Sequence, residues 1–179
     1  MDLSTTALPT PARWRAGLSR PRSVDPELAD RGYWVLPGRL MAGRFPANLR
    51  QPSVSSGDLP RPDRLSRRGT ELRVAALRAA GITQIAAFIE PAEFLRMGWR
   101  SATEAQLHLK RSGIRLTIYP TPDWCPVPPE TMQRAQADID RALAAGEGVL
   151  ICCKEGIGRT ATATGRFLVR SGYSRYFLL

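Results

Sequence analysis

The chain of 179 residues is poor in the residue types that build metal centres and disulfide frameworks. Its single histidine, His108, stands alone in the sequence, so a histidine-based metal site is not expected. Of its three cysteines, Cys152 and Cys153 are adjacent, and such a set does not form a disulfide framework. A reducing cytoplasm is the location that this cysteine usage favours.

Long apolar runs are absent as well. No stretch approaches the roughly 18 apolar residues of a membrane helix, and residues 1–22 have no apolar core of the kind found in a signal peptide. The sequence therefore predicts no membrane insertion and no secretion.

Lysine is scarce, because Lys110 and Lys154 are the only two, yet the net charge is +10 and is carried by arginine. Such a charge suits nucleic acid, anionic lipid or phosphorylated substrates. The arginines are scattered outside residues 61–68 and the N-terminal tail, and neither an aromatic-basic RNA motif nor a DNA-reading helix is present. We therefore expect no nucleic-acid partner, and we expect the positive charge to attract anionic substrates.

One motif stands out, Ile-Cys-Cys-Lys-Glu-Gly-Ile-Gly-Arg-Thr over residues 151–160. Cys153 lies six residues before Arg159, and Thr160 follows directly. An apolar run over 148–152 precedes the motif and a helix-permissive run over 160–171 follows it. The pattern predicts a strand, a tight loop and a helix.

A loop of this kind turns backbone N–H groups inward and adds the positive end of the helix, which together bind a tetrahedral oxyanion. Gly156 and Gly158 permit the positive φ values and close approach that such a loop needs. Arg159 can place its fork on two phosphate oxygens. The same field favours a thiolate nucleophile at Cys153, and Thr160 can donate its hydroxyl to that sulfur. The alternative interpretation is a buried cysteine pair that acts as small hydrophobes.

A proton donor for a leaving group is expected thirty residues upstream, at Asp123. Apolar and polar residues alternate over 114–119, as is typical of a strand. The prolines that follow enforce a non-helical loop, in which Asp123 lies beside Trp124. A carboxylic acid there would protonate the departing oxygen and later accept a proton from water. The alternative is that Asp123 is only a turn or helix-cap residue.

With both motifs in view, the sequence resembles the cysteine-dependent protein tyrosine phosphatase superfamily, and within it the compact dual-specificity branch with its bacterial members. The family signature His-Cys-x-x-Gly-x-x-Arg-Ser/Thr is matched by Cys153, Gly156, Arg159 and Thr160. Asp123 stands in the place of the general acid, in a matching Pro-Asp-aromatic-x-x-Pro context. Segments 34–43 and 76–90 are similar to the opening hairpin and the next helix and strand of that branch, and the resemblance spans about residues 32–172.

The resemblance implies hydrolysis of phosphomonoesters on protein tyrosine, and on serine or threonine, through a phosphocysteine. It implies a phosphorylated protein or peptide as partner and neither a metal nor a cofactor. The expected substrate-binding residues are Lys154, Glu155, Gly156, Ile157, Gly158 and Arg159. A catalytically weak phospho-binding module and a phosphoinositide phosphatase are the alternatives, the second because Lys154 follows the nucleophile.

The chain departs from the family pattern at three points. Cys152 replaces the histidine before the nucleophile, and Ala161 stands where glycine is common. The chain also ends about twenty residues after Arg159, so we expect the C-terminal helices of the family to be missing. Because thiolates oxidise readily, Cys152 or Cys125 is a candidate to capture an oxidised Cys153. Whether either thiol reacts stays open from the sequence.

The whole pattern predicts an α/β fold with a mostly parallel central sheet flanked by helices. Residues 1–31 read as a loose arm and 32–179 as one catalytic domain, with a polar loop over 46–68 near the rim of the site. Strands are expected at 33–45 (two, joined at Pro37-Gly38), 82–89, 114–119 and 149–152, and helices at 70–80, 91–99, 102–111 and 128–145. Side chains expected in the core include Leu72, Val74, Leu77, Ala80, Met132, Ala135, Ile139 and Leu143. The ligand would bind beyond the carboxyl ends of the strands.

Overall fold

Strands and helices alternate along the chain in the computed structural model, which describes residues 32–47 and 65–172. The elements are β1 (Gly32–Leu36), β2 (Leu40–Arg44), α3 (Leu65–Ala79), β3 (Ile82–Ala87), α4 (Glu93–Arg96), α5 (Ala102–Arg111), β4 (Arg115–Ile118), α6 (Pro129–Ala144), β5 (Gly148–Cys153) and α7 (Gly158–Arg170). The arm expected over 1–31 and most of the loop expected over 46–68 lie outside the described residues.

The strands form a single five-stranded sheet in the order β1-β2-β5-β3-β4. β1 and β2 form an antiparallel hairpin, and every other neighbouring pair is parallel. β5 is the central strand, and all six of its residues are buried. The expectation of a mostly parallel sheet flanked by helices is thus confirmed.

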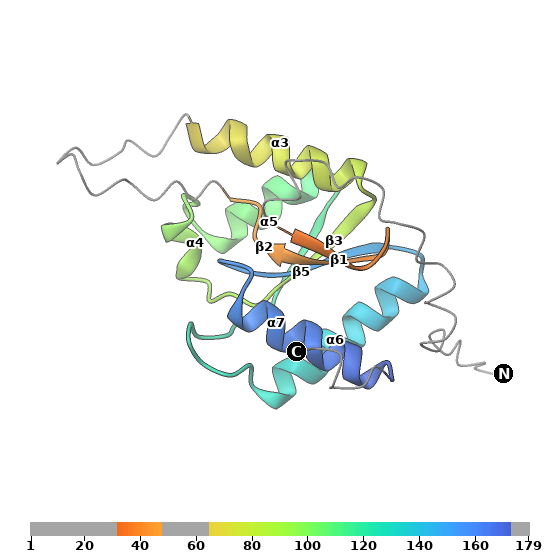
Figure 1. Ribbon diagram of the computed structural model, residues 1–179. Coiled ribbons are helices and arrows are strands. Elements are labelled where there is room, and N and C mark those ends of the chain that lie inside the picture. Colours follow the sequence, from red (N-terminus) through yellow and green to blue (C-terminus); the bar gives the residue numbers. More distant parts are fainter. Residues whose placement is uncertain (1–31, 48–64, 173–179) are drawn as a thin grey trace, which may run out of the picture.

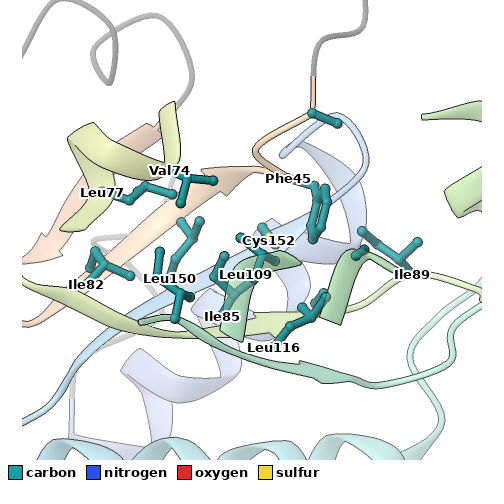
Figure 2. Close-up of a cluster of buried hydrophobic side chains, with 14 of the residues drawn as sticks. Phe45, Val74, Leu77, Ile82, Ile85, Ile89, Leu109, Leu116, Leu150 and Cys152 are labelled. Atoms are coloured by element: carbon teal, nitrogen blue, oxygen red, sulfur yellow. The ribbon is translucent and has the colours of Figure 1, made fainter. Parts of the chain in front are cut away.

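Helices cover both faces of the sheet, with α3, α4 and α5 on one side and α6 and α7 on the other (Figure 1). Because side chains alternate along a strand, Leu150 and Cys152 of β5 enter the first core while Val149 and Ile151 enter the second. Figure 2 draws the first core, where Val74 and Leu77 of α3 and Leu109 of α5 meet strand residues. The second core contains Met132, Ala135, Ile139 and Leu143, which confirms the spacing expected for α6.

Three expectations about the first face were wrong. The helix expected at 70–80 begins at Leu65, so residues 65–68 are helical rather than part of a loop. Leu72 is 54% exposed, because it lies two residues from the buried Val74 and so points about 200° away around the helix. The helix expected at 91–99 is only the short α4, since the chain turns at Gly98 with a φ of 85°.

The parallel strands bring four chain segments to one edge of the sheet. The carboxyl ends of β2, β5, β3 and β4 lie there side by side, and each strand is followed by a loop or short helix. That edge is where ligands bind in open α/β sheets. The next section describes the side chains that gather there.

Candidate functional site

The loop after β5 carries the motif found in the sequence. Cys153 ends the strand with 3% of its surface exposed, and the N–H of Gly156 donates to its Sγ at 3.3 Å. Gly156 has a φ of +77°, and a Cβ there would lie 2.6 Å from the carbonyl carbon of Gly43 in β2. The loop therefore packs so tightly against β2 that only glycine fits at residue 156.

Helix α7 begins at Gly158 with an open N-terminus. Ile157 occupies the cap position without a side-chain hydrogen bond, and the first turn holds no acidic residue. The unpaired N–H groups and the positive end of a 13-residue helix thus meet the loop that holds Cys153. This arrangement is one that favours a bound anion.

Arg159, the second residue of α7, is buried and contacts three other residues. Its Nη1 donates to Glu93 Oε2 at 2.6 Å and its Nη2 to Glu93 Oε1 at 3.0 Å, which is a two-pronged pair. Nη1 also donates to the carbonyl oxygen of Thr121 at 2.8 Å. Nη2 lies 3.1 Å from Asp123 Oδ1, so the predicted acid and the predicted phosphate-binding arginine are in contact.

The electrostatics of the Arg159–Glu93 pair keep both groups charged. Burial raises the pKa of Glu93, but the hydrogen bonds from Arg159 and from the Glu90 amide, with the Arg159 charge, leave that pKa below its ordinary value. Burial lowers the pKa of Arg159, and the hydrogen bond and charge of Glu93 then raise that pKa above the usual range. Glu93 is therefore an anion that holds a permanent cation in the core.

Asp123 differs from Glu93 in its exposure. Its side chain is 48% exposed, whereas that of Glu93 is 7% exposed. Its Oδ1 accepts the N–H of Trp124, which has a φ of 62° and a side chain that is 97% exposed. A positive φ is strained for a bulky residue, and here it lies directly after the predicted acid.

The remaining residues expected at the site lie around the loop. The hydroxyl of Thr160 donates to the carbonyl of Gly43 at 3.4 Å and makes no hydrogen bond to the sulfur of Cys153. Lys154 Nζ lies 3.9 Å from Glu155 Oε1, and Ile157 is 74% exposed. The expected contact of Thr160 with the sulfur is therefore not formed in this structure, because the hydroxyl instead ties α7 to β2.

The two other thiols have opposite environments. Cys152 is fully buried, and burial together with the neighbouring Cys153 raises its pKa well above the ordinary value, so this thiol is neutral. Cys125 is exposed in the loop that carries Asp123. Because thiolates rather than thiols react, Cys152 is the weaker candidate for capturing an oxidised Cys153.

Sequence reasoning missed two charged residues of this edge, Glu93 and Arg44. Glu93 is the first residue of α4, which follows β3, and Arg44 is the last residue of β2, where its Nη2 donates to Glu155 Oε2. Both lie near the carboxyl end of a strand that the sequence does predict, at the edge where parallel strands end. A search for charged residues in the last positions of each expected strand and in the segment that follows it would have found them.

Within residues 32–47 and 65–172, no group of three or more His, Cys, Asp or Glu side chains is arranged to hold a metal ion.

Across the part of the chain that the structure describes, every helix is too short or too polar to cross a bilayer.

No family model matches this sequence. Among solved structures, a mutant form of Tk-PTP has 18% sequence identity and a TM-score of 0.59, over 83% of this chain and 78% of that chain. TpbA of P. aeruginosa, in complex with pTyr, has 16% identity and a TM-score of 0.53, over 88% and 73%. PTPMT1 in complex with PI(5)P has 13% identity and a TM-score of 0.56, over 79% and 74%. The described chain therefore has the fold of the cysteine-dependent protein tyrosine and dual-specificity phosphatases.

Proposed function

We propose that this protein hydrolyses phosphomonoesters on protein tyrosine, and on serine or threonine, through a phosphocysteine at Cys153. One observation carries the proposal. The sulfur of Cys153 lies in a tight loop at an uncapped helix N-terminus, and the guanidinium of that helix, at Arg159, already contacts the carboxylate of Asp123. The residues that we propose as nucleophile, anion-binding group and acid thus lie at one edge of the sheet.

In the first step the thiolate of Cys153 attacks phosphorus. The S–P bond forms as the bond from phosphorus to the substrate oxygen breaks, and protonated Asp123 gives its proton to that oxygen. Arg159 and the loop amides stabilise the charge on the equatorial phosphoryl oxygens, which is the dominant contribution in phosphoryl transfer.

In the second step water attacks the phosphocysteine. Asp123, now ionised, accepts a proton from that water, and the thiolate leaves as inorganic phosphate forms. The N–H of Gly156, which donates to Sγ at 3.3 Å, stabilises the departing thiolate. Thr160 is proposed to assist the sulfur as well, after its hydroxyl turns from the carbonyl of Gly43.

Substrate binding requires an exchange of partners at Arg159. Both of its Nη atoms already contact carboxylates, and of these Asp123 is the one half exposed to water. We infer that a phosphate oxygen replaces Asp123 at Nη2 while Glu93 stays in place. The released carboxyl group is then next to the phosphate and available as the acid.

Turnover of para-nitrophenyl phosphate by the full chain tests the proposal. Activity is expected in the presence of a chelator, with inhibition by orthovanadate, which mimics the pentacoordinate transition state. Cys153→Ser is expected to abolish turnover while phosphate binding, measured by calorimetry, persists. Turnover that survives this substitution would exclude Cys153 as the nucleophile.

A panel of substrates separates the remaining alternatives. Release of phosphate from phosphotyrosine, phosphoserine and phosphothreonine peptides and from phosphoinositides can be compared under one condition. Lys154, which directly follows Cys153, favours the lipid as the second candidate, whereas the carboxylate of Glu155 beside it favours the peptides. Tight binding of phosphopeptide with no release of phosphate would instead identify a phospho-binding module.

A further inference from the structure

The phosphate-binding loop contains one carboxylate, that of Glu155, two residues after Cys153. Glu155 is 42% exposed in its side chain, and its Oε2 accepts a hydrogen bond from Arg44 Nη2. Its Oε1 lies 3.9 Å from Lys154 Nζ, near the outer limit of an ion pair. A carboxylate at this place would repel a phosphate dianion if no cation offset its charge.

Arg44 reaches Glu155 from a different strand. It ends β2 opposite Cys153 in the parallel pairing, so its backbone lies beside the strand end that carries the sulfur. Its side chain is 27% exposed, and its Nε is buried without a hydrogen-bond partner. Within the described residues, Glu155 is the one group to which the Arg44 side chain donates.

The shape of the loop does not depend on this ion pair. The N–H of Phe45 donates to the carbonyl of Cys153 at 2.9 Å, and the hydroxyl of Thr160 donates to the carbonyl of Gly43. Gly156 packs directly against the backbone of Gly43 and Arg44. These contacts, none of which involves the Arg44 side chain, already fix the loop on β2, so charge is what that side chain adds.

We propose that Arg44 sets the anion affinity of the phosphate-binding loop by neutralising Glu155. This inference rests on the proposed function of the same site. Arg44 and Lys154 together outweigh the charge of Glu155, which leaves the lip of the loop positive. Without Arg44, Lys154 and Glu155 cancel, and the carboxylate faces the incoming phosphate with a single, more distant partner.

The two ends of this ion pair therefore have opposite effects. Arg44→Ala is expected to raise KM for para-nitrophenyl phosphate and the dissociation constant for inorganic phosphate by roughly tenfold, with a much smaller change in kcat. Glu155→Gln is expected to lower both constants, because it removes the carboxylate and leaves Arg44 and Lys154 positive beside the incoming phosphate. The double variant, which carries both substitutions, should recover to within about threefold of the wild type, because the removed carboxylate no longer needs a counter-charge.

The dependence on ionic strength shows whether Arg44 acts through its charge or through the conformation of the loop. The Arg44→Ala defect should shrink as ionic strength rises from about 0.01 M to about 1 M, because the screening length falls from about 30 Å to about 3 Å. Arg115→Ala is the matched control, since it removes an arginine from the ion pair with Glu147 at the opposite edge of the sheet. This control should leave both constants unchanged.

Binding of inorganic phosphate, followed by calorimetry on the full chain, gives a readout that is independent of turnover. A phosphate affinity of Arg44→Ala equal to that of the wild type would overturn the proposal. An equal loss of affinity in Arg44→Ala and Glu155→Gln would also overturn it, because the ion pair would then act by holding the loop in its conformation rather than by its charge. A defect in the double variant as large as that in Arg44→Ala would also overturn it. If the wild type itself neither binds phosphate nor turns over substrate, the proposed function fails, and this inference fails with it.

Discussion

At the scale of single residues, the two carboxylates on Arg159 have different roles because they differ in their access to water. Glu93 is buried and holds both Nη atoms, whereas Asp123 is half exposed and touches only one. We expect the buried partner to keep the guanidinium in place and the exposed partner to exchange with phosphate. We therefore expect a substitution of Glu93 to affect mainly stability and a substitution of Asp123 to affect mainly catalysis.

Glu93→Gln should mainly destabilise the fold. Removing one partner of a buried ion pair costs about 3–5 kcal/mol, because the remaining charge loses its compensation. Asp123 and the Thr121 carbonyl still contact Arg159, so we expect the lower end of that range. Urea unfolding followed by circular dichroism measures the change. A loss below about 1 kcal/mol would contradict the assigned role.

The direction of the Glu93 pKa shift predicts how the stability difference between the wild type and Glu93→Gln depends on pH. The pKa of Glu93 is lower in the folded state than its ordinary value of 4.5, so the unfolded chain takes up the proton first as pH falls. The stabilisation is fully present above that value and is lost as pH falls through the folded pKa. The difference between wild type and Glu93→Gln should therefore be larger at about pH 7 than at about pH 3. A difference that stays constant would exclude the shift.

Asp123→Asn should slow catalysis according to the leaving group. General acid catalysis contributes about 10²–10⁴ in rate, and a poor leaving group needs it most. The loss of kcat should be larger for phosphoserine peptides than for para-nitrophenyl phosphate, whose phenolate leaves easily. Asp140→Asn, in α6 where Asp140 pairs with Arg170 of α7, is the control. Equal losses for both substrates would remove Asp123 from the role of acid.

At the scale of elements, the loop and helix after β5 depend on two glycines of unequal importance. Gly156→Ala places a Cβ 2.7 Å from the backbone nitrogen of Arg44 at a φ of +77°, so the loop must shift away from β2. Gly158→Ala meets no atom within 4 Å. We expect Gly156→Ala to weaken phosphate binding by more than about tenfold and Gly158→Ala by less than about twofold, as measured by calorimetry. Similar effects of the two substitutions would contradict the packing of this loop.

An element can be predicted from the sequence when the residues that form it lie close together along the chain. The loop from Cys153 to Arg159 was predictable because its spacing, glycines and flanking patterns all lie within one short stretch. Helix α6 was predictable because its buried side chains recur every three to four residues. The start of α3 was not, since residues 65–68 have no apolar spacing that would mark a helix.

The partners of the predicted site residues could not be predicted in the same way. Glu93 lies 66 positions from Arg159 along the chain, and Arg44 lies 111 positions from Glu155. Only the sheet order, in which β2 and β3 flank β5, brings these pairs together. The sequence predicts that the strands exist, but their order depends on packing across the whole sheet.

At the scale of the whole molecule, the core and the site are built from the same strands but at different places along them. Leu150 is 2% exposed in the middle of β5, between Met41 of β2 and Ile85 of β3. Leu150→Ala should lower the free energy of unfolding by about 2–5 kcal/mol while KM stays near the wild-type value under conditions where the variant is folded. Leu95→Ala, at a 63% exposed side chain, is the control. A large change in KM alone would show that the site depends on this part of the core.

Trp124 has a practical consequence. Among the tryptophans whose side chains the structure describes (Trp34, Trp99 and Trp124), it is the one exposed to water, and its backbone N–H contacts Asp123. An indole in water emits at longer wavelength than one that is partly covered, so its fluorescence can be told apart from that of Trp34 and Trp99 once Trp14, the fourth tryptophan of the sequence, is replaced by Phe. Any movement of this loop that buries the indole would shift the emission, and the protein thereby carries an optical probe next to Asp123.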